Sequence, residues 1–123
     1  MTVKQISKEQ LRERLGERGL TIIDVRANWP ESQRKIPGAV HESAEAVADW
    51  ASRYDPEKPV VVYGARPKDA DGREEAADLV AAGFSDVSVL TGGWPVWQTA
   101  EMPAEKRAGD PLPKGVVPGV GKP

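Results

Sequence analysis

Short runs of β-branched residues, separated by stretches with helical periodicity, constrain the fold of this chain more than any other feature. Such runs occur at residues 20–25 (LTIIDV), 59–63 (PVVVY) and 86–90 (DVSVL). The first run lacks a regular alternation of apolar and polar residues, which is typical of a strand covered on both faces. Because strands alternate with helices, we predict an α/β fold with a mostly parallel sheet, whose ligands bind beyond the carboxyl ends of the strands.

The stretches between these runs carry helical signals. Ser7 and Gln10 form a predicted capping box for a helix over residues 8–15. Residues 73–82 place apolar side chains on one side of another helix, which Gly83 is suited to end in the left-handed conformation. The prediction is completed by a short strand over 3–7, a turn and then a short extended piece within 36–40, a helix over 43–53, a central strand over 59–63 and a last helix that opens over 92–97.

The charge balance and the hydropathy exclude several classes of partner. Seventeen Lys and Arg against 19 Asp and Glu give a formal net charge of -2, without the basic excess that binding to a nucleic-acid backbone requires. No apolar run approaches the roughly 20 residues of a membrane span, and residues 1–8 lack the apolar core of a signal peptide. We therefore expect a cytoplasmic protein that binds neither nucleic acid nor a membrane.

The length and the distribution of proline divide the chain into one domain and a tail. A chain of 123 residues is in the size range of a single domain. The residues near the carboxyl terminus are rich in proline and glycine and include few large apolar side chains, a composition typical of flexible segments. We predict a domain over residues 1–104 and a flexible tail over residues 105–123.

The chain has no cysteine, which excludes disulfide bonds, thiolate metal sites and a cysteine nucleophile. Its single histidine, His41, is next to Glu42 and close to Glu45. One imidazole with nearby carboxylates does not specify a metal site, so we expect His41 to be a surface residue. The sequence predicts neither a metal nor a cofactor.

The loop after the central run is the candidate binding site, because the amino terminus of the next helix presents free N–H groups to anions. Its candidate residues are Gly64, Ala65, Arg66, Lys68, Asp69, Asp71, Gly72 and Arg73. Among them, the cations Arg66, Lys68 and Arg73 could hold an oxyanion. However, Asp71 and Glu74 form a predicted acidic capping box that would occupy the same N–H groups. An anion-binding loop and a self-capped, solvated turn are both open.

Five short motifs follow one another in a fixed order. They are TIIDVR at 21–26, IPGA at 36–39, VVVY at 60–63, AAGF at 81–84 and LTGG at 90–93, the last followed by Trp97. In this order and spacing, the sequence over roughly residues 3–104 resembles the rhodanese-like domain family. The resemblance implies a three-layer α/β sandwich whose central, mostly parallel sheet has about five strands.

The resemblance also implies where the chemistry of active members takes place. They carry a cysteine directly after the central strand, which accepts a sulfane sulfur from thiosulfate or mercaptopyruvate as a persulfide; phosphatases of the same fold attack phosphate with the equivalent cysteine. Here Gly64 follows the strand, and counting back from Gly83 places Arg66 at that position, in a loop about two residues longer than usual. Neither alignment provides a thiol, so the usual reaction is chemically unavailable.

Four further residues are expected near the mouth of this loop. Asp24 and Arg26 match the Asp-Val-Arg segment of the family, which the resemblance places near the active loop. The structural alternative, which we favour, is a buried hydrogen-bonded pair that fixes the end of the strand. Trp29 and Trp94 are expected around the mouth, where they could either pack or wall a pocket or a partner surface. The other two tryptophans are expected in the core.

Two classes of function follow. The first is a catalytically inactive rhodanese-like module with a binding or regulatory role, whose partner is a small anion or another protein. The second is an enzyme with different chemistry in the same crevice, sulfurtransferase-related or a hydrolysis of a phosphorylated or sulfur-containing ester assisted by Asp69 or Asp71. The missing thiol favours the first class.

Overall fold

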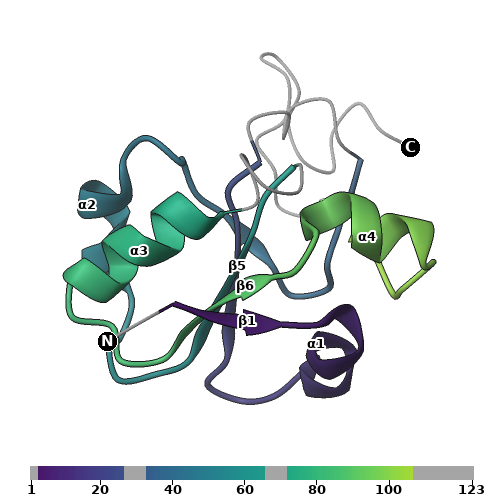
Figure 1. The fold of residues 1–123 in the computed structure, drawn as a ribbon, viewed down its shortest axis with the longest axis horizontal. Helices are drawn as coiled ribbons and strands as arrows, with labels where there is room; N and C mark the ends of the chain where they lie inside the picture. The colour runs from purple at the N-terminus through teal and green to yellow at the C-terminus, as the bar shows by residue number, and fades with distance from the viewer. Residues whose placement is uncertain (1–2, 27–32, 66–71, 107–123) are drawn as a thin grey trace, which may run out of the picture.

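One parallel sheet of five strands forms the centre of the molecule (Figure 1). The computed structural model describes residues 3–26, 33–65 and 72–106. The strand order is β1-β6-β5-β2-β4, and every neighbouring pair is parallel. The strands are β1 (Lys4–Ile6), β2 (Thr21–Asp24), β4 (Val40–His41), β5 (Val60–Tyr63) and β6 (Val87–Leu90). The predicted central position of the 59–63 run is confirmed, since β5 lies between β2 and β6.

Helices cover both faces of the sheet, which gives the predicted three layers (Figure 1). On one side lie α2 (Val47–Trp50), extended by a 3-10 turn over Ala51–Arg53, and α3 (Arg73–Ala81); on the other lie α1 (Lys8–Arg14) and α4 (Gly93–Thr99). The side chains of β5 alternate between two apolar cores, with Val60 and Val62 in the first and Val61 and Tyr63 in the second. Burial on both faces explains why the strand sequence is apolar throughout. None of the helices described is long and apolar enough to cross a membrane.

The helix signals of the sequence are confirmed at two ends. The capping box of α1 is present: the Ser7 N–H donates to Gln10 Oε1 at 2.9 Å, and the Gln10 N–H donates to Ser7 Oγ at 3.0 Å. At the end of α3, Gly83 has a φ of 104°. The Phe84 N–H then donates to the Leu79 carbonyl at 3.0 Å, which completes a Schellman motif.

The helix predicted over residues 43–53 begins later than expected, at Val47. Ser43 starts a turn instead, in which its Oγ accepts from the Glu45 N–H and its carbonyl accepts from the Trp50 Nε1. A serine side chain that bonds to nearby backbone competes with a helix, so the periodic apolar pattern overstated the helix length.

A second, two-stranded antiparallel sheet joins segments far apart in the sequence, and the sequence patterns did not predict it. It pairs β3 (Arg34–Lys35) with β7 (Glu105–Lys106). Glu105 ties the pair to the domain: its carboxylate lies 3.2 Å from Lys35 Nζ and accepts from the Gly38 N–H at 3.0 Å. The two residues placed at the start of the predicted tail are therefore part of a strand. The remainder of that tail, from residue 107 onward, lies outside the described residues.

Candidate functional site

The candidate loop leaves the sheet at the carboxyl end of β5, where its first residue is fixed by its backbone. Gly64 is buried, and its carbonyl accepts a hydrogen bond of 2.9 Å from the N–H of Trp94 in the first turn of α4. Ala65 is half-buried. The predicted site residues Arg66, Lys68, Asp69, Asp71 and Trp29 lie outside the described residues.

The loop returns to the same strand end at Gly72. Gly72 is buried with a φ of 99°, and a Cβ added there would lie 2.8 Å from Val62 Cγ1. Because of this close approach and the positive φ, only glycine fits without strain. Gly72 is also the N-cap of α3, with no side-chain cap, so the capping box predicted with Asp71 at the N-cap is wrong. Arg73 follows as the first, exposed residue of α3.

Asp24 and Arg26 form the buried hydrogen-bonded pair that the sequence analysis favoured. The Arg26 Nη2 lies 2.6 Å from Asp24 Oδ2, Nε donates to the same oxygen at 2.9 Å, and the Arg26 N–H donates to Oδ1 at 2.9 Å. Both side chains are at most 1% exposed. The pair fixes the chain where β2 ends, and each charge is balanced by the other.

Tyr63 connects this pair to the central strand. Its hydroxyl donates to Asp24 Oδ2 at 2.7 Å and accepts from the Ile36 N–H at 3.3 Å. Burial, followed by the negative charge of Asp24, raises the pKa of the Tyr63 hydroxyl well above its usual range. The hydroxyl therefore stays protonated and remains a donor to the carboxylate. Sequence reasoning missed this role, although a hydroxylated aromatic at the end of an otherwise aliphatic strand was a possible signal.

The Arg26 guanidinium is enclosed by aromatic rings as well as by Asp24. Its Cζ lies 4.5 Å from the centre of the Trp94 ring and 5.5 Å from that of Tyr63. Its Nη2 also donates to the Arg34 carbonyl at 2.9 Å. Trp94 itself is 8% exposed, so in this structure its ring packs on Arg26 and Tyr63.

The remaining candidates from the sequence occupy ordinary structural positions. Trp50 and Trp97 lie in the core as predicted, at 2% and 0% exposure, and the Trp97 Nε1 donates to the Pro103 carbonyl at 2.7 Å. His41 is half-buried at the end of β4, with Nε2 3.2 Å from the Arg26 carbonyl. Over residues 3–26, 33–65 and 72–106, no three His, Asp or Glu side chains gather in a group that could hold a metal ion.

A parallel sheet between two layers of helices places the protein among the α/β sandwiches. A family model described as the rhodanese-like domain matches residues 7–100. The chain belongs to this family, as its motif order indicated.

Relatives that are named as sulfurtransferases align with most of the chain. It is 35% identical to a thiosulfate sulfurtransferase GlpE of Pseudomonas syringae pv. syringae, over 78% of this chain and 88% of the relative. A GlpE protein of Coxiella burnetii is 33% identical, over 80% of this chain and 90% of its own length. A crystal structure of the Alr3790 protein from Anabaena sp. superposes with a TM-score of 0.70 at 31% identity, covering 81% of this chain and 79% of that one.

Proposed function

We propose that this protein is a non-catalytic rhodanese-like module that binds a small anion or a protein partner at the carboxyl end of its sheet. One observation carries the proposal: the residue that follows the central strand is Gly64, in a chain without cysteine. Sulfur transfer through a persulfide requires a thiolate, and glycine has no side chain to replace it. The relatives' names describe an activity whose nucleophile this chain does not contain.

The geometry around Gly64 supports binding over catalysis. The loop begins with a carbonyl that accepts a hydrogen bond from the first turn of α4, and it ends at Gly72, where an added Cβ would meet Val62 of β5. Arg26, just after the end of β2, is neutralised by Asp24. Arg73 is exposed at the first position of α3, where backbone N–H groups and the helix dipole favour an anion.

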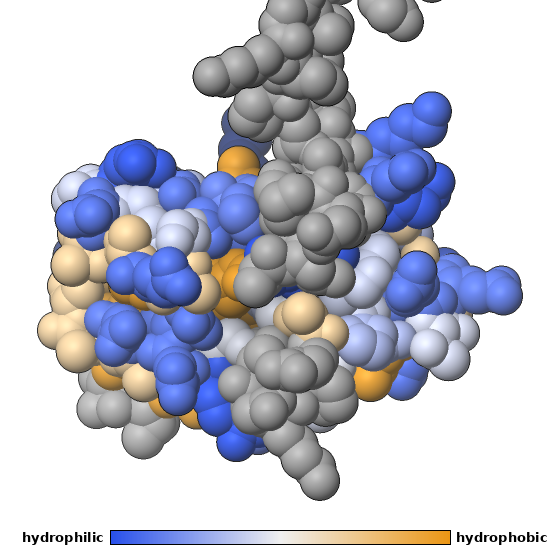
Figure 2. Space-filling model, turned by 90° about the horizontal axis from the view of Figure 1, so that it is seen from above, coloured by the Kyte–Doolittle hydropathy of each residue, from blue (hydrophilic) through white to orange (hydrophobic). Residues whose placement is uncertain are grey.

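The described residues visible at this end of the molecule are mostly hydrophilic (Figure 2). Figure 2 shows the molecule from above, the side toward which β5 points in Figure 1, with hydrophilic residues over much of the visible surface and smaller apolar patches between them. The alternative of ester hydrolysis depends on Asp69 and Asp71, and no described contact favours it.

The absence of sulfur transfer is tested by mass spectrometry. The purified full chain is incubated with thiosulfate and its intact mass is measured, with the Pseudomonas syringae GlpE protein as the positive control. We expect no adduct of about 32 Da, the mass of one persulfide sulfur, and no thiocyanate when cyanide is added. The Gly64→Cys variant tests whether a thiol at this position accepts sulfur from thiosulfate. We expect at most a small fraction of this variant to be modified. Robust thiocyanate formation by the unmodified chain would overturn the proposal.

Binding of an anion is tested by amide NMR on the same material. Sulfate, thiosulfate and phosphate are titrated separately at constant ionic strength, with chloride as the control. We expect saturable shifts at Gly64, Ala65, Gly72 and Arg73, and a loss of affinity of roughly tenfold in Arg73→Gln. If these signals do not move with any of the three anions, the anion is excluded as the ligand.

A further inference from the structure

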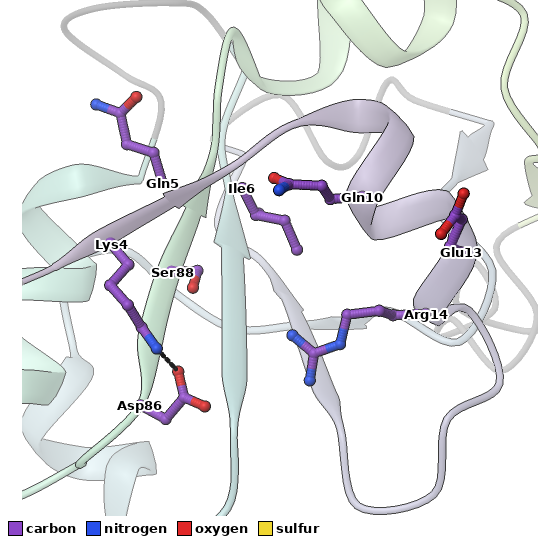
Figure 3. Close-up of a pocket in the computed structure, with 8 residues that line it drawn as sticks. All are labelled: Lys4, Gln5, Ile6, Gln10, Glu13, Arg14, Asp86 and Ser88. Atoms are coloured by element: carbon purple, nitrogen blue, oxygen red, sulfur yellow. Dashed lines mark ion pairs between the residues drawn. The ribbon is translucent and has the colours of Figure 1, made fainter.

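A groove outside the candidate site lies between the edge strand β1 and helix α1 (Figure 3). It has a volume of about 470 Å³. Lys4 and Ile6 of β1 line it together with Ser88 of β6, the residue paired with Lys4. Arg14 reaches into it from α1, and Asp86 closes the end near the start of β6. The groove lies near the amino ends of the strands, away from the loop at the carboxyl ends.

The floor of this β1–α1 groove contains a buried hydroxyl without a partner. Ser88 is 7% exposed, although every other residue of β6 is aliphatic. In the part of the chain that the structure describes, its Oγ has no hydrogen bond to any residue. Burying an unpaired hydroxyl is unfavourable, so such groups normally have a partner. Figure 3 shows the Ser88 side chain between Lys4, Asp86 and the end of Arg14.

The charged groups around this hydroxyl retain both an unused hydrogen-bond acceptor and an unused hydrogen-bond donor. Lys4 Nζ contacts Asp86 Oδ1 at 2.7 Å, which leaves Asp86 Oδ2 as an acceptor. Arg14 uses Nε and Nη2 on the carboxylate of Glu17, each at 2.9 Å, which leaves Nη1 as a donor. Glu17, and to a smaller extent Asp86, raise the pKa of the Arg14 guanidinium.

The signs of these charges restrict the ligand. A purely anionic ligand that approaches Arg14 also meets Asp86, and a purely cationic one that approaches Asp86 also meets Lys4 and Arg14. A ligand with one charge of each sign satisfies both groups. Its apolar part can lie on Ile6 and on the aliphatic stems of Lys4 and Arg14.

We infer that the β1–α1 groove binds a small zwitterion of the α-amino acid class. The carboxylate accepts hydrogen bonds from Arg14 Nη1 and the Ser88 hydroxyl, and the ammonium group donates to Asp86 Oδ2. This site is independent of the proposed function at the loop, because it shares no residue with it.

The inference is tested by amide NMR with probes that separate the two charges. L-leucine and L-glutamine carry both charges, 4-methylpentanoate carries only the carboxylate, and 3-methylbutylamine carries only the ammonium group. We expect saturable shifts of the amides of Lys4, Ile6 and Ser88 with an amino acid. We also expect at least about tenfold weaker binding of both singly charged probes.

Matched variants test the named contacts. Ser88→Ala removes the buried hydroxyl, and Ser85→Ala removes an exposed one in the turn before β6. Ser88→Ala and Asp86→Asn should each weaken binding roughly tenfold, whereas Ser85→Ala should not change it. The Ser88→Ala variant should fold as well as the parent, because the lost hydroxyl has no partner among the residues that the structure describes.

Three results would overturn the inference. The first is the absence of a saturable shift with either amino acid up to about 10 mM, at which a site with a Kd of about 1 mM would be mostly occupied. The second is equal affinity for L-leucine and 4-methylpentanoate, which would show that Asp86 contributes nothing. The third is an unchanged affinity in Ser88→Ala.

Discussion

Replacing Arg26 by methionine tests the buried ion pair at the end of β2. The substitution Arg26→Met keeps a long side chain beside Trp94 but removes the charge that faces Asp24. The Asp24 carboxylate is 0% exposed and would keep only the Tyr63 hydroxyl and the N–H of residue 26 as donors. Breaking a buried pair by removing one partner costs about 3–5 kcal/mol, because the other charge stays in a medium of low polarity. We therefore expect the free energy of unfolding to fall by about this amount.

Urea unfolding followed by tryptophan fluorescence and by far-UV circular dichroism measures the effect. With a slope of about 2 kcal/mol per molar urea, a loss of about 4 kcal/mol lowers the midpoint by about 2 M. Arg14→Met is the matched control, since Arg14 and its partner Glu17 are 32% and 42% exposed. Breaking such an exposed pair costs at most about 1 kcal/mol.

A double variant separates the cost of the unpaired Asp24 charge from the cost of lost packing around residue 26. Asp24→Asn combined with Arg26→Met removes both charges and keeps an acceptor for the Tyr63 hydroxyl. It should recover at least half of the stability lost in the single variant, because no uncompensated charge remains. If Arg26→Met costs no more than Arg14→Met, the reasoning about a desolvated Asp24 carboxylate is refuted.

Three further substitutions test other contacts of the fold. Gly72→Ala should lose about 1–2 kcal/mol from its left-handed backbone and an additional amount from the contact with Val62. Its control is Gly16→Ala, at a φ of 82° with nothing within 4 Å of the new Cβ; equal losses in thermal unfolding would contradict the Val62 contact. Tyr63→Phe should cost about 1–3 kcal/mol in urea unfolding, because it leaves Asp24 with one donor fewer; a neutral result would show that this hydrogen bond adds no stability. Glu105→Gln tests how stability depends on pH. The Gly38 N–H, and then Lys35, lower the pKa of the Glu105 carboxyl below 4.5 in the folded state. A lowered folded-state pKa adds stability that is complete above the unfolded-state pKa and is lost as the pH falls through the folded-state value. The difference in stability between the parent and Glu105→Gln should therefore shrink below about pH 4.5, and a difference that is constant from pH 7 to pH 3 would contradict the assignment.

The features that the sequence predicted correctly are those that depend on neighbouring residues. Ser7 with Gln10 and Gly83 act within one turn of a helix, and the run at 60–63 can only be a buried strand. Asp24 and Arg26 are two positions apart, so their pairing follows from local chain geometry once both are buried.

The features that the sequence did not predict depend on contacts between distant segments. Gly72 is the N-cap of α3 and lies so close to Val62 that a Cβ does not fit, a contact that no local capping rule contains. The pairing of β3 with β7 joins residues about 70 positions apart, and two-residue strands leave no periodic pattern. The groove beside β1 was missed for the same reason, because it is formed only when Lys4, Arg14 and Ser88 meet in space.

The pairing of β3 with β7 affects where the carboxyl-terminal boundary of the domain should be placed. The match to the family model ends at residue 100, yet the Trp97 indole, the Arg34 guanidinium and Lys35 all have partners between residues 103 and 105. A fragment trimmed to the region of similarity would leave those groups without their native acceptors. The folding unit therefore extends past the matched region, and comparisons of stability across relatives should retain residues 101–106.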